Sequence, residues 1–294
     1  MVLWPLLHLV MSVDTKDVTV VIVVCPLDDH ALAREVVNAT SNQKPAEVVV
    51  VSSTENFEFA RRIASIDALR VVRVEQETPL GFARNLGVET STTRFVAFLD
   101  SDAVPRPGWL EALCAHLGED DVAAVGGPVL PVWPESRAPV LFRHSASAQH
   151  FLSMFDLGNQ TISVSCVLPG NMAIDRKVME SLPFDSAAGR QVGSLIGAEE
   201  IPMMIRSREA GYQVIYEPRS VVDHHTRSDR MNWAWMWRRV FAAGRESARQ
   251  RGVLEPLPRR DSITDVAFKV VVAVPYCLGK LVEIGSLRLS KDRK

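Results

Sequence analysis

Cysteine is scarce in this chain of 294 residues, and no two cysteines stand at Cys-x-x-Cys spacing. The four cysteines are Cys25, Cys114, Cys166 and Cys277, and three of them lie inside apolar runs. This pattern favours buried free thiols over disulfides or zinc ligands. It fits a reducing compartment, so we expect a cytoplasmic protein.

A strong net charge is also missing, because 33 basic residues nearly balance 35 acidic ones. The near balance argues against a protein that coats nucleic acid, and we expect no nucleic-acid partner. Apolar residues make up 47% of the chain, which is enough for a sizeable core in one or two domains. We find no internal repeat and no low-complexity tract.

Long uninterrupted hydrophobic runs are lacking too. The first eleven residues are apolar, but they have no basic flank or cleavage site and are too short to span a bilayer. The second apolar stretch, residues 266–280, is interrupted by Lys269 and Pro275. It falls short of the roughly twenty mostly apolar residues of a transmembrane helix. We therefore expect no membrane-spanning segment.

The apolar tail still allows two interpretations. It could lie in the membrane interface, at the inner face of the plasma membrane, with basic residues meeting anionic lipid. These residues are Lys280, Arg288, Lys291, Arg293 and Lys294. Alternatively, the tail is a helix packed against the domain or against a partner subunit.

Apolar runs alternate with helical patterns over the first half of the chain. The expected strands are 18–25, 47–51, 69–74, 94–99 and 122–125, and the expected helices are 31–40, 57–64, 81–89 and 107–117. This alternation with short connections predicts right-handed βαβ units and a parallel sheet covered by helices.

Beyond residue 132 the alternation fails. There we expect helices near 151–155, from 200 to Gly211 and over 231–251, and strands over 162–168, 212–216 and 220–223.

The strand expected at 94–99 leads into two carboxylates, Asp100 and Asp102, whose spacing places both on one side of an extended backbone. In an open parallel sheet, ligands bind just beyond the carboxyl ends of the strands. Close carboxylates repel each other unless a cation lies between them, and hard oxygen ligands suit Mg²⁺ or Mn²⁺ together with a phosphate. The alternative is a polar turn in which Asp102 caps a helix near Pro107.

Five features, in this order, resemble glycosyltransferase family 2 over roughly residues 18 to 250. Each is degenerate, but their order is much more specific than any one motif. They are the β-branched opening strand with a polar turn after Pro26; Gly81 to Gly87; Phe98 to Asp102 followed by Pro and Trp-Leu; Glu199-Glu200 followed by Arg206 and Gly211-Tyr212; and Tyr216 to His224.

The resemblance implies an α/β fold of the GT-A type, a Rossmann-like, mostly parallel sheet flanked by helices, with a C-terminal helical extension. It divides the chain into an N-terminal extension (1–16), a GT-A domain (17–252) and a helical, membrane-associated tail (253–294). Within the domain, 17–132 would bind the nucleotide and 133–252 the acceptor.

The implied activity is metal-dependent, inverting transfer of a sugar from a nucleotide-sugar donor, a UDP-sugar first of all. The acceptor would be a hydroxyl on a glycan, a lipid-linked molecule or a small molecule. Mn²⁺ or Mg²⁺ would offset the charge on the departing diphosphate, and a general base would take the acceptor's proton.

The resemblance assigns the metal to Asp102, Asp100 and His224, although His224 could be a polar turn residue and His225 stands beside it. It assigns proton abstraction to Glu200, with Glu199 next to it. Acidic residues are common in the first turn of a helix, so a helix cap is the alternative for this pair.

Donor contacts are expected from the ends of several strands and helices. The residues are Pro26, Asp28, Ser52, Arg84, Asn85, Asp100, Ser101, Gly170 and Asn171. Arg84 would meet a phosphate or the base edge, or be a solvated helix charge. The Gly170–Asn171 turn would contact the donor sugar, or be an ordinary turn.

Three departures from the family pattern stand out. The second strand ends in Ser52-Ser53 rather than acidic residues, and Glu200 stands where aspartate is usual. The Gln-x-x-Arg-Trp signature of processive synthases is missing, which argues against a polymerising enzyme. Trp233, Trp237 and Phe241 recur every fourth residue, a spacing that favours a packed core stripe over a sugar-stacking platform.

Two other functions compete with this one. A sugar-nucleotidyltransferase would need a glycine-rich phosphate loop directly after the first strand, and Pro26-Leu-Asp-Asp-His lacks it. A catalytically silent GT-A domain could bind a glycan or scaffold a membrane complex. The Ser52-Ser53 departure motivates this second alternative, and the retained Asp100, Asp102, Glu200 and His224 weaken it.

Overall fold

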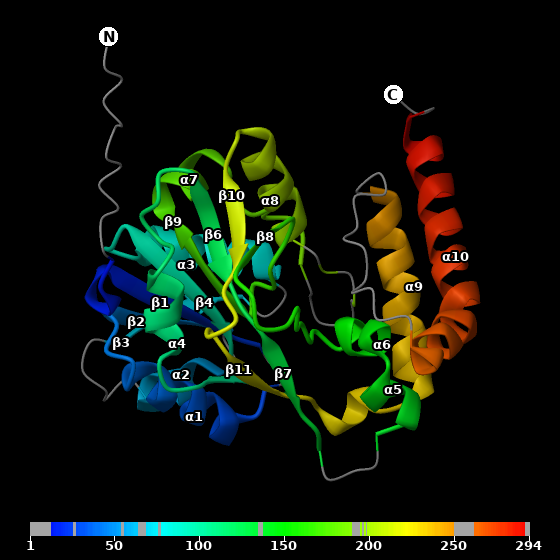
Figure 1. The fold of residues 1–294 in the computed structure, drawn as a ribbon, viewed down its shortest axis with the longest axis horizontal. Coiled ribbons are helices and arrows are strands. Elements are labelled where there is room, and N and C mark those ends of the chain that lie inside the picture. The colour runs from blue at the N-terminus through cyan, green and yellow to red at the C-terminus, as the bar shows by residue number, and fades with distance from the viewer. Residues whose placement is uncertain are drawn as a thin grey trace.

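A computed structural model places ten helices and eleven strands among the residues it describes (Figure 1). The described residues are 13–25, 28–53, 56–63, 69–75, 78–134, 138–189, 195, 197, 199–249 and 262–291. Pro26, expected at the donor site, lies outside them.

The main sheet has eight strands in the order β3-β2-β1-β4-β9-β6-β10-β8. Their bounds are β1 Val18–Val24, β2 Glu47–Ser53, β3 Leu69–Val74, β4 Phe95–Asp100, β6 Val122–Gly126, β8 Ile162–Val164, β9 Asn171–Asp175 and β10 Gln213–Tyr216. Neighbouring strands pair in parallel except where β9 meets β4 and β6, and where β8 meets β10. The mostly parallel sheet is therefore confirmed.

Strand β9 was not expected, and β8 is shorter than the predicted strand over 162–168. β9 enters the sheet antiparallel, between β4 and β6, so it closes the gap that the βαβ series leaves there. All five of its residues are buried. A short buried segment of this kind carries no period that distinguishes it from other apolar stretches.

A second sheet of three strands lies at the edge of the first, in the order β5-β11-β7. Its strands are β5 Ala103–Pro105, β7 Val129–Val132 and β11 Val222–His225. β11 pairs antiparallel with β5, which directly follows the central strand β4, and so brings residues 222–225 beside 103–105. This pairing positions one half of the site described below.

Helices cover both faces of the main sheet (Figure 1). Their bounds are α1 His30–Ser41, α2 Phe57–Ile63, α3 Leu80–Thr90, α4 Trp109–Cys114, α5 Val140–His144, α6 Ala146–Phe151, α7 Arg176–Ser181, α8 Glu200–Glu209, α9 Trp233–Arg249 and α10 Ile263–Lys291, with short 3₁₀ turns at Thr15–Asp17 and Ser228–Arg230. Alternate residues of β1 enter opposite core clusters: Val20 and Ile22 in one, Val21 and Val23 in the other. All seven residues of β1 are buried, as a strand covered on both faces requires.

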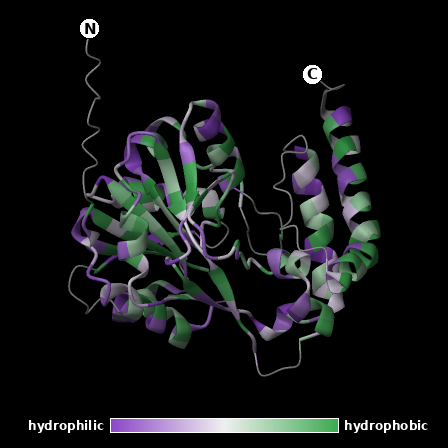
Figure 2. Ribbon diagram, in the orientation of Figure 1, coloured by the Kyte–Doolittle hydropathy of each residue, from purple (hydrophilic) through white to green (hydrophobic). Residues whose placement is uncertain are grey.

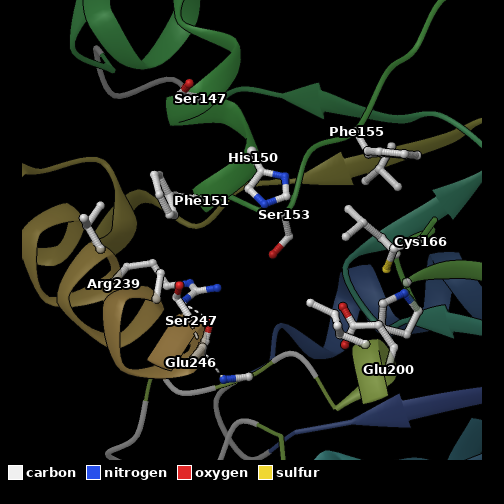
Figure 3. A pocket seen from close by; sticks show the side chains of 18 of the residues that line it. Ser147, His150, Phe151, Ser153, Phe155, Cys166, Glu200, Arg239, Glu246 and Ser247 are labelled. Atoms are coloured by element: carbon white, nitrogen blue, oxygen red, sulfur yellow. Dashed lines mark hydrogen bonds and ion pairs between the residues drawn. The ribbon is translucent and has the colours of Figure 1, made fainter. Parts of the chain in front are cut away.

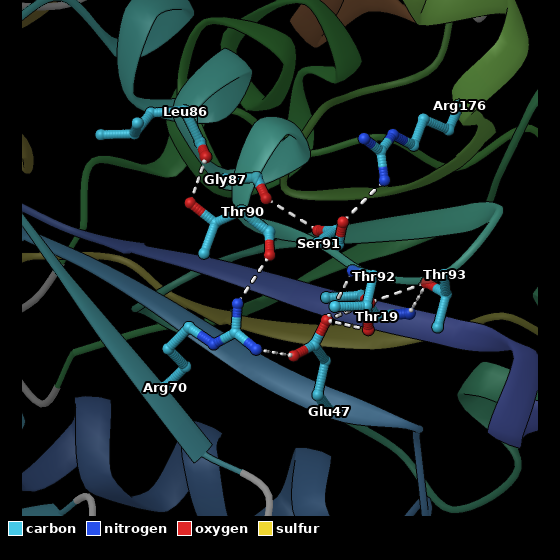
Figure 4. A network of polar contacts seen from close by, with 10 residues as sticks. All are labelled: Thr19, Glu47, Arg70, Leu86, Gly87, Thr90, Ser91, Thr92, Thr93 and Arg176. Atoms are coloured by element: carbon cyan, nitrogen blue, oxygen red, sulfur yellow. Dashed lines mark hydrogen bonds and ion pairs between the residues drawn. The ribbon is translucent and has the colours of Figure 1, made fainter.

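Glu47, the first residue of β2, holds together the end of the sheet at which β2 begins (Figure 4). Its Oε1 accepts hydrogen bonds from the Thr19 hydroxyl (3.0 Å) and from the backbone nitrogen of Thr92 (2.8 Å), and Arg70 Nη2 lies 3.3 Å from its Oε2. Burial opposes ionisation of Glu47, but these bonds outweigh it and lower its pKa. The network joins β1, β2 and β3 to the segment that leads into β4.

A third core cluster lies beside the sheet, where α9 and α10 run side by side in the same direction and pack on α5 and α6 (Figure 1). Glycines allow the close approach: a Cβ at Gly244 would overlap the Tyr276 carbonyl, and one at Gly279 the Phe241 carbonyl. Trp235 and Met236 are buried in this cluster, whereas Trp237 is 49% exposed. The prediction of a core stripe through Trp237 was wrong, because α10 covers the adjacent face of α9.

Helix α10 is longer than the sequence pattern suggested, since it continues through Pro275 for 29 residues. A stretch of 26 residues, Ile263–Arg288, is long and apolar enough to cross a membrane by length and composition. The expectation that this run falls short was therefore wrong. The ribbon of α10 is largely hydrophobic in Figure 2. Its exposed apolar side chains are Ile263, Val266, Val270, Val271, Val274, Leu278, Leu281, Val282 and Leu287.

Two further expectations are adjusted. The helix expected near 151–155 is α6, which ends at Phe151, and Ser153 then adopts a left-handed conformation with φ of 66°. Cys114 and Cys166 are buried free thiols as predicted, whereas Cys277 is exposed.

Candidate active site

A cavity of about 660 Å³ separates the carboxyl end of the central strands from helices α6, α9 and α10. One wall contains Asp100, Glu199, Glu200 and His224, which come from three distant parts of the chain. The opposite wall comes from the helices and includes His150 and Arg239 (Figure 3). Three of the acidic residues singled out in the sequence, Asp100, Glu199 and Glu200, therefore meet at one cavity, at the sheet edge where an open α/β sheet binds ligands.

Asp102 and His224 lie close together because β11 pairs with β5. The backbone nitrogen of His225 donates to the Asp102 carbonyl (2.8 Å), and His224 stands opposite Ala103 in the register. His224 Nε2 is 3.5 Å from Asp102 Oδ1, and His224 is 3% exposed. Its Nδ1 is buried and has no hydrogen-bond partner among the described residues.

These side chains fit a divalent cation held by few protein ligands. Among the described residues, no group of three or more His, Cys, Asp or Glu side chains forms a complete cation cage. Mg²⁺ commonly binds through one or two carboxylates, with substrate phosphates and water as further ligands. Asp102 and His224 offer one oxygen and one nitrogen from adjacent strands, which matches such a partial set.

Arg84 is buried and joins the two acidic segments of the site. Its Nη2 donates to Asp100 Oδ1 (3.0 Å), and its Nη1 donates to Glu199 Oε1. The helix α3 brings Arg84 under the end of β4, since Gly87 on the same helix packs directly on Val21 of β1. Arg84 is therefore not a solvated helix charge, because its guanidinium is bound by two carboxylates of the protein.

Glu199 and Glu200 begin helix α8 but face different partners. Glu199 lies at the N-cap position, makes no side-chain cap, and accepts from Arg84. Glu200 is 6% exposed and its carboxylate points into the cavity (Figure 3). The alternative that Glu199 merely caps the helix is therefore not supported by the N-cap geometry.

Asp28 and Ser101 form a second polar pair at the ends of β1 and β4. Asp28 Oδ2 accepts from the Cys25 backbone nitrogen (2.6 Å) and from the Ser101 hydroxyl. Burial, together with the nearby Asp102 carboxylate, outweighs the opposing Ser101 bond and raises the pKa of Asp28 to about 6. Together with Asp100 and Asp102, this carboxyl makes the edge of the sheet strongly acidic.

Two asparagines expected at the donor have their amides occupied within the protein. Asn85 binds the backbone of Phe184 through both Nδ2 (3.0 Å) and Oδ1 (3.2 Å). Asn171 is fully buried: its Oδ1 accepts from Trp109 Nε1 (2.8 Å), and its Nδ2 donates to the carbonyls of Pro128 (2.9 Å) and Ser220 (2.7 Å). Both side chains fasten loops around the site.

Gly170 and Ser52 take different places. A Cβ at Gly170 would lie 2.7 Å from Asp100 Oδ2, so glycine lets the 169–171 turn approach that carboxylate. Ser52 is fully buried at the end of β2, opposite Val24 of β1. Its hydroxyl donates to the Ser53 carbonyl (3.3 Å), so it lies beneath the surface.

Sequence reasoning missed two groups. Asn56 donates to the Cys25 carbonyl (2.6 Å) and binds His30 Nε2 (2.9 Å), while the His30 ring stacks on Phe59 at 4.1 Å between centroids. These contacts hold the segments that follow β1 and β2 against each other. The polar residue directly before the helical pattern at 57–64 was the available signal for it.

The second missed group is the ion pair Arg239–Glu246 on α9. Arg239 Nη1 lies 3.1 Å and 3.2 Å from the two carboxylate oxygens, and Glu246 also accepts from the Gly197 backbone nitrogen (2.6 Å). Glu246 thereby joins α9 to the segment that leads into Glu199 and Glu200. No signal in the sequence indicates that Glu246 is buried.

Comparison with known proteins gives consistent relatives. A family described as "Glycosyltransferase like family 2" matches residues 17–246. A glucosyl-dolichyl phosphate glucuronosyltransferase of Haloferax volcanii is 28% identical over 92% of this chain and 88% of that protein. A pre-mycofactocin glycosyltransferase of Mycobacterium tuberculosis is 34% identical over 55% of this chain, which spans about a third (33%) of that protein.

Solved structures share the fold at low sequence identity. A mannosyltransferase from Pyrobaculum calidifontis, in complex with GDP-Man and Mn²⁺, aligns with a TM-score of 0.59 at 20% identity, over 93% of this chain and 75% of that one. GalNAc-T7 with UDP, GalNAc and Mn²⁺ aligns with a TM-score of 0.57 at 15% identity, over 87% of this chain and 54% of that one. Both are similar in the arrangement of the sheet and its helices.

Proposed function

This chain belongs to the glycosyltransferase 2-like family, and we propose that it is a metal-dependent, inverting enzyme of that family. It would transfer a sugar from a nucleotide-sugar donor, a UDP-sugar first of all, to an acceptor hydroxyl. One observation carries the proposal. Asp100, Glu200 and His224 line one cavity, and Asp102 lies 3.5 Å from His224, although Asp100 and His224 are more than 120 residues apart along the chain.

The donor diphosphate would lie at the carboxyl end of β4. Asp102 and His224 would hold a divalent cation there, Mn²⁺ or Mg²⁺, which would offset the charge of the departing diphosphate. The neutral imidazole suits Mn²⁺ better than Mg²⁺. Besides burial, the Asp102 and Asp100 carboxylates help to raise the pKa of Asp28, and a cation at this edge would offset that repulsion.

Glu200 would deprotonate the acceptor hydroxyl. It faces the cavity, whereas Glu199 accepts a charge-assisted hydrogen bond from Arg84. Protonation of Glu199 would give up that bond, so Glu199 is the poorer proton acceptor. Arg84 would act by holding Asp100 and Glu199 at fixed positions, which orders the cavity wall around Glu200.

The acceptor would be a lipid-linked molecule. The cavity extends from Glu200 to apolar side chains of α10, including Phe268 and Val272. The outer face of α10 exposes a stripe of valines and leucines suited to the membrane interface. The Haloferax relative, whose name includes a dolichyl phosphate, supports this choice. We place the enzyme at the cytoplasmic face of a membrane.

A thermal-shift panel tests the function. Nucleoside diphosphates and their sugars are added to the full chain with and without Mn²⁺. One diphosphate should stabilise the protein only with the metal, by up to about 2.7 kcal/mol at a hundredfold excess over its Kd. Stabilisation by no nucleotide under any metal condition would contradict the proposal. Donor binding without turnover on any lipid-linked acceptor would point to a non-catalytic GT-A domain.

A further inference from the structure

The two walls of the cavity carry opposite charge. On the sheet wall, three acidic side chains (Asp100, Glu199 and Glu200) face one basic side chain, Arg84. On the wall made by α9 and α10, three basic side chains line the cavity with one acidic side chain: Arg239, Lys269, Lys280 and Glu246. The acidic wall suits a cation and a general base. The basic wall instead suits an anionic group of a ligand.

The positive surplus of the helical wall has a definite origin. Lys269 pairs with Asp265 (3.0 Å), which lies behind the wall, fully buried, and also accepts from Ser145 and Ser147. Arg239 is matched by Glu246. Lys280 is half-buried and makes no ion pair with another described residue. The net charge that faces the cavity from this wall is therefore positive.

Arg239 also keeps donors for a ligand. A guanidinium has five N–H groups, and the bonds to Glu246 use only Nη1. Its Nε is buried and has no partner among the described residues. Figure 3 shows the guanidinium pointing into the cavity, with the His150 ring pointing into the same space from α6. Buried polar groups without partners are costly unless a ligand or water satisfies them.

His150 is neutral in this setting. Burial, and after it the Arg239 charge, lower its pKa to about 4, although Glu246 opposes the shift. Its Nδ1 is buried without a hydrogen-bond partner among the described residues. A neutral imidazole can donate one hydrogen bond to an oxyanion, and it adds no further positive charge beside the guanidinium.

The same wall continues into an apolar surface. Phe268, Val272, Ala273 and Tyr276 of α10 line the cavity beyond the charged residues. A small soluble anion would bind the charged residues and leave the apolar surface exposed to water. A phosphate joined to an apolar chain would use both parts.

We propose that the wall formed by α6, α9 and α10 is an acceptor subsite that binds a phosphate group through Arg239, Lys280 and His150, with an apolar chain along α10. The inference rests on the proposed function in taking the Glu200 wall as the side of sugar transfer. Its occupant is an isoprenoid-type lipid phosphate carrying a sugar, and a hydroxyl of that sugar reaches toward Glu200.

Binding to the full chain tests the subsite with three probes: farnesyl phosphate, farnesol and inorganic phosphate. Farnesyl phosphate should bind about 10- to 100-fold more tightly than farnesol, because charge-assisted hydrogen bonds to phosphate are among the strong ones. Equal affinity for the two would overturn the phosphate site. Inorganic phosphate as tight as farnesyl phosphate would overturn the apolar part and point to a soluble phosphate.

Two variants and one control test which residues cause the preference for farnesyl phosphate over farnesol. The double variant R239M/E246Q removes the ion pair without leaving a lone buried carboxylate, and K280M removes the second charge. Each should reduce the preference for farnesyl phosphate over farnesol by at least about tenfold. R238M is the matched control, because Arg238 is exposed on the same helix and donates to the Ala234 carbonyl. Unchanged preference in K280M and in the double variant would exclude the subsite; if the double variant does not fold, K280M decides.

Nucleotide binding separates this inference from the function on which it rests. Thermal shifts of the parent with nucleoside diphosphate and Mn²⁺ report the acidic wall alone. Normal shifts without a phosphate preference would remove the subsite and leave the proposed function intact. A preference for farnesyl phosphate without any thermal shift by nucleotide would support phosphate binding at the helical wall and contradict the proposed function.

Discussion

Arg84 donates a hydrogen bond to Glu199, 115 residues further along the chain, and both side chains are almost completely buried. The same guanidinium binds Asp100 at 3.0 Å. One cation thus couples the end of the central strand to the start of helix α8. The contact orders the acidic wall before any ligand arrives.

Arg84→Met should therefore destabilise the fold by about 3–5 kcal/mol, because it leaves two carboxylates without their buried partner. Urea unfolding measures the change. Arg84→Lys should recover only part of the loss, since an ammonium cannot offer the two planar donors that reach Asp100 and Glu199 together. Full stability in Arg84→Met would show that the bridge does not order the site.

Asp102→Asn should abolish metal-dependent nucleotide binding and leave the protein folded. The amide keeps the size of the side chain but removes the charge next to His224. Calorimetric titration of UDP with Mn²⁺ measures the affinity. Asp223→Asn is the matched control: it lies beside His224 on β11 but pairs with Arg106 (2.7 Å), away from the cavity. Unchanged affinity in Asp102→Asn would remove the metal role.

Glu200→Gln should bind donor and metal as the parent does, while turnover falls by roughly two to four orders of magnitude, the usual range for loss of a general base. The change is nearly isosteric and keeps the first residue of α8. Turnover needs an identified acceptor, or donor hydrolysis by water as a weaker substitute.

Glu199→Gln is the comparison for that variant. It should lose stability, because Arg84 loses a charged partner, with a smaller loss of turnover than Glu200→Gln. A collapse of turnover confined to Glu199→Gln would move the base one residue earlier, and normal turnover in Glu200→Gln would exclude that residue.

Glu217 should make the fold sensitive to acid. Burial opposes its ionisation, but bonds from Arg219 and His116 outweigh burial and lower its pKa to about 2. The unfolded value is 4.5, so this contribution to stability is complete above pH 4.5 and is lost as the pH falls through about 2. The difference corresponds to about 3 kcal/mol.

Denaturant unfolding across this pH range measures the effect. Glu217→Gln should be destabilised at neutral pH and should lose that part of the acid dependence. Glu58→Gln is the control, because Glu58 is exposed on α2. The same acid dependence in Glu217→Gln as in the parent would contradict the assignment.

The exposed face of α10 should bind membranes. Val266→Ser, Val270→Ser and Val274→Ser together remove three side chains that are 51%, 69% and 67% exposed, so stability should change little. The triple variant should no longer sediment with anionic vesicles. Deletion of the helix is a poorer test, because it would uncover Trp235 and Met236.

Phe82→Ser provides the control for the vesicle experiment, since Phe82 is an exposed apolar residue (46%) on α3. It should sediment as the parent does. If the parent itself does not sediment with vesicles, or if both variants lose binding equally, the outer face of α10 is not a membrane surface.

The sequence alone predicted the strand and helix series up to residue 125, except for the short strand β5, and singled out Asp100, Glu199 and Glu200, which line the cavity. β-branched runs such as 18–24 and the Asp100–Asp102 step have local periods and spacings, and these survive in a single sequence. The order of the family-like motifs was likewise readable, so the α/β fold with a mostly parallel sheet was predicted correctly.

Only the tertiary structure decided which of those residues are paired with each other. Asn85 and Asn171 have the composition of ligand-binding residues, yet their amides are used by loops 99 and 49 residues away. Arg84 meets Glu199, 115 residues away, because packing of α3 on β1 brings the guanidinium under the end of β4. Long-range packing sets these partners, and no local spacing in the chain encodes it.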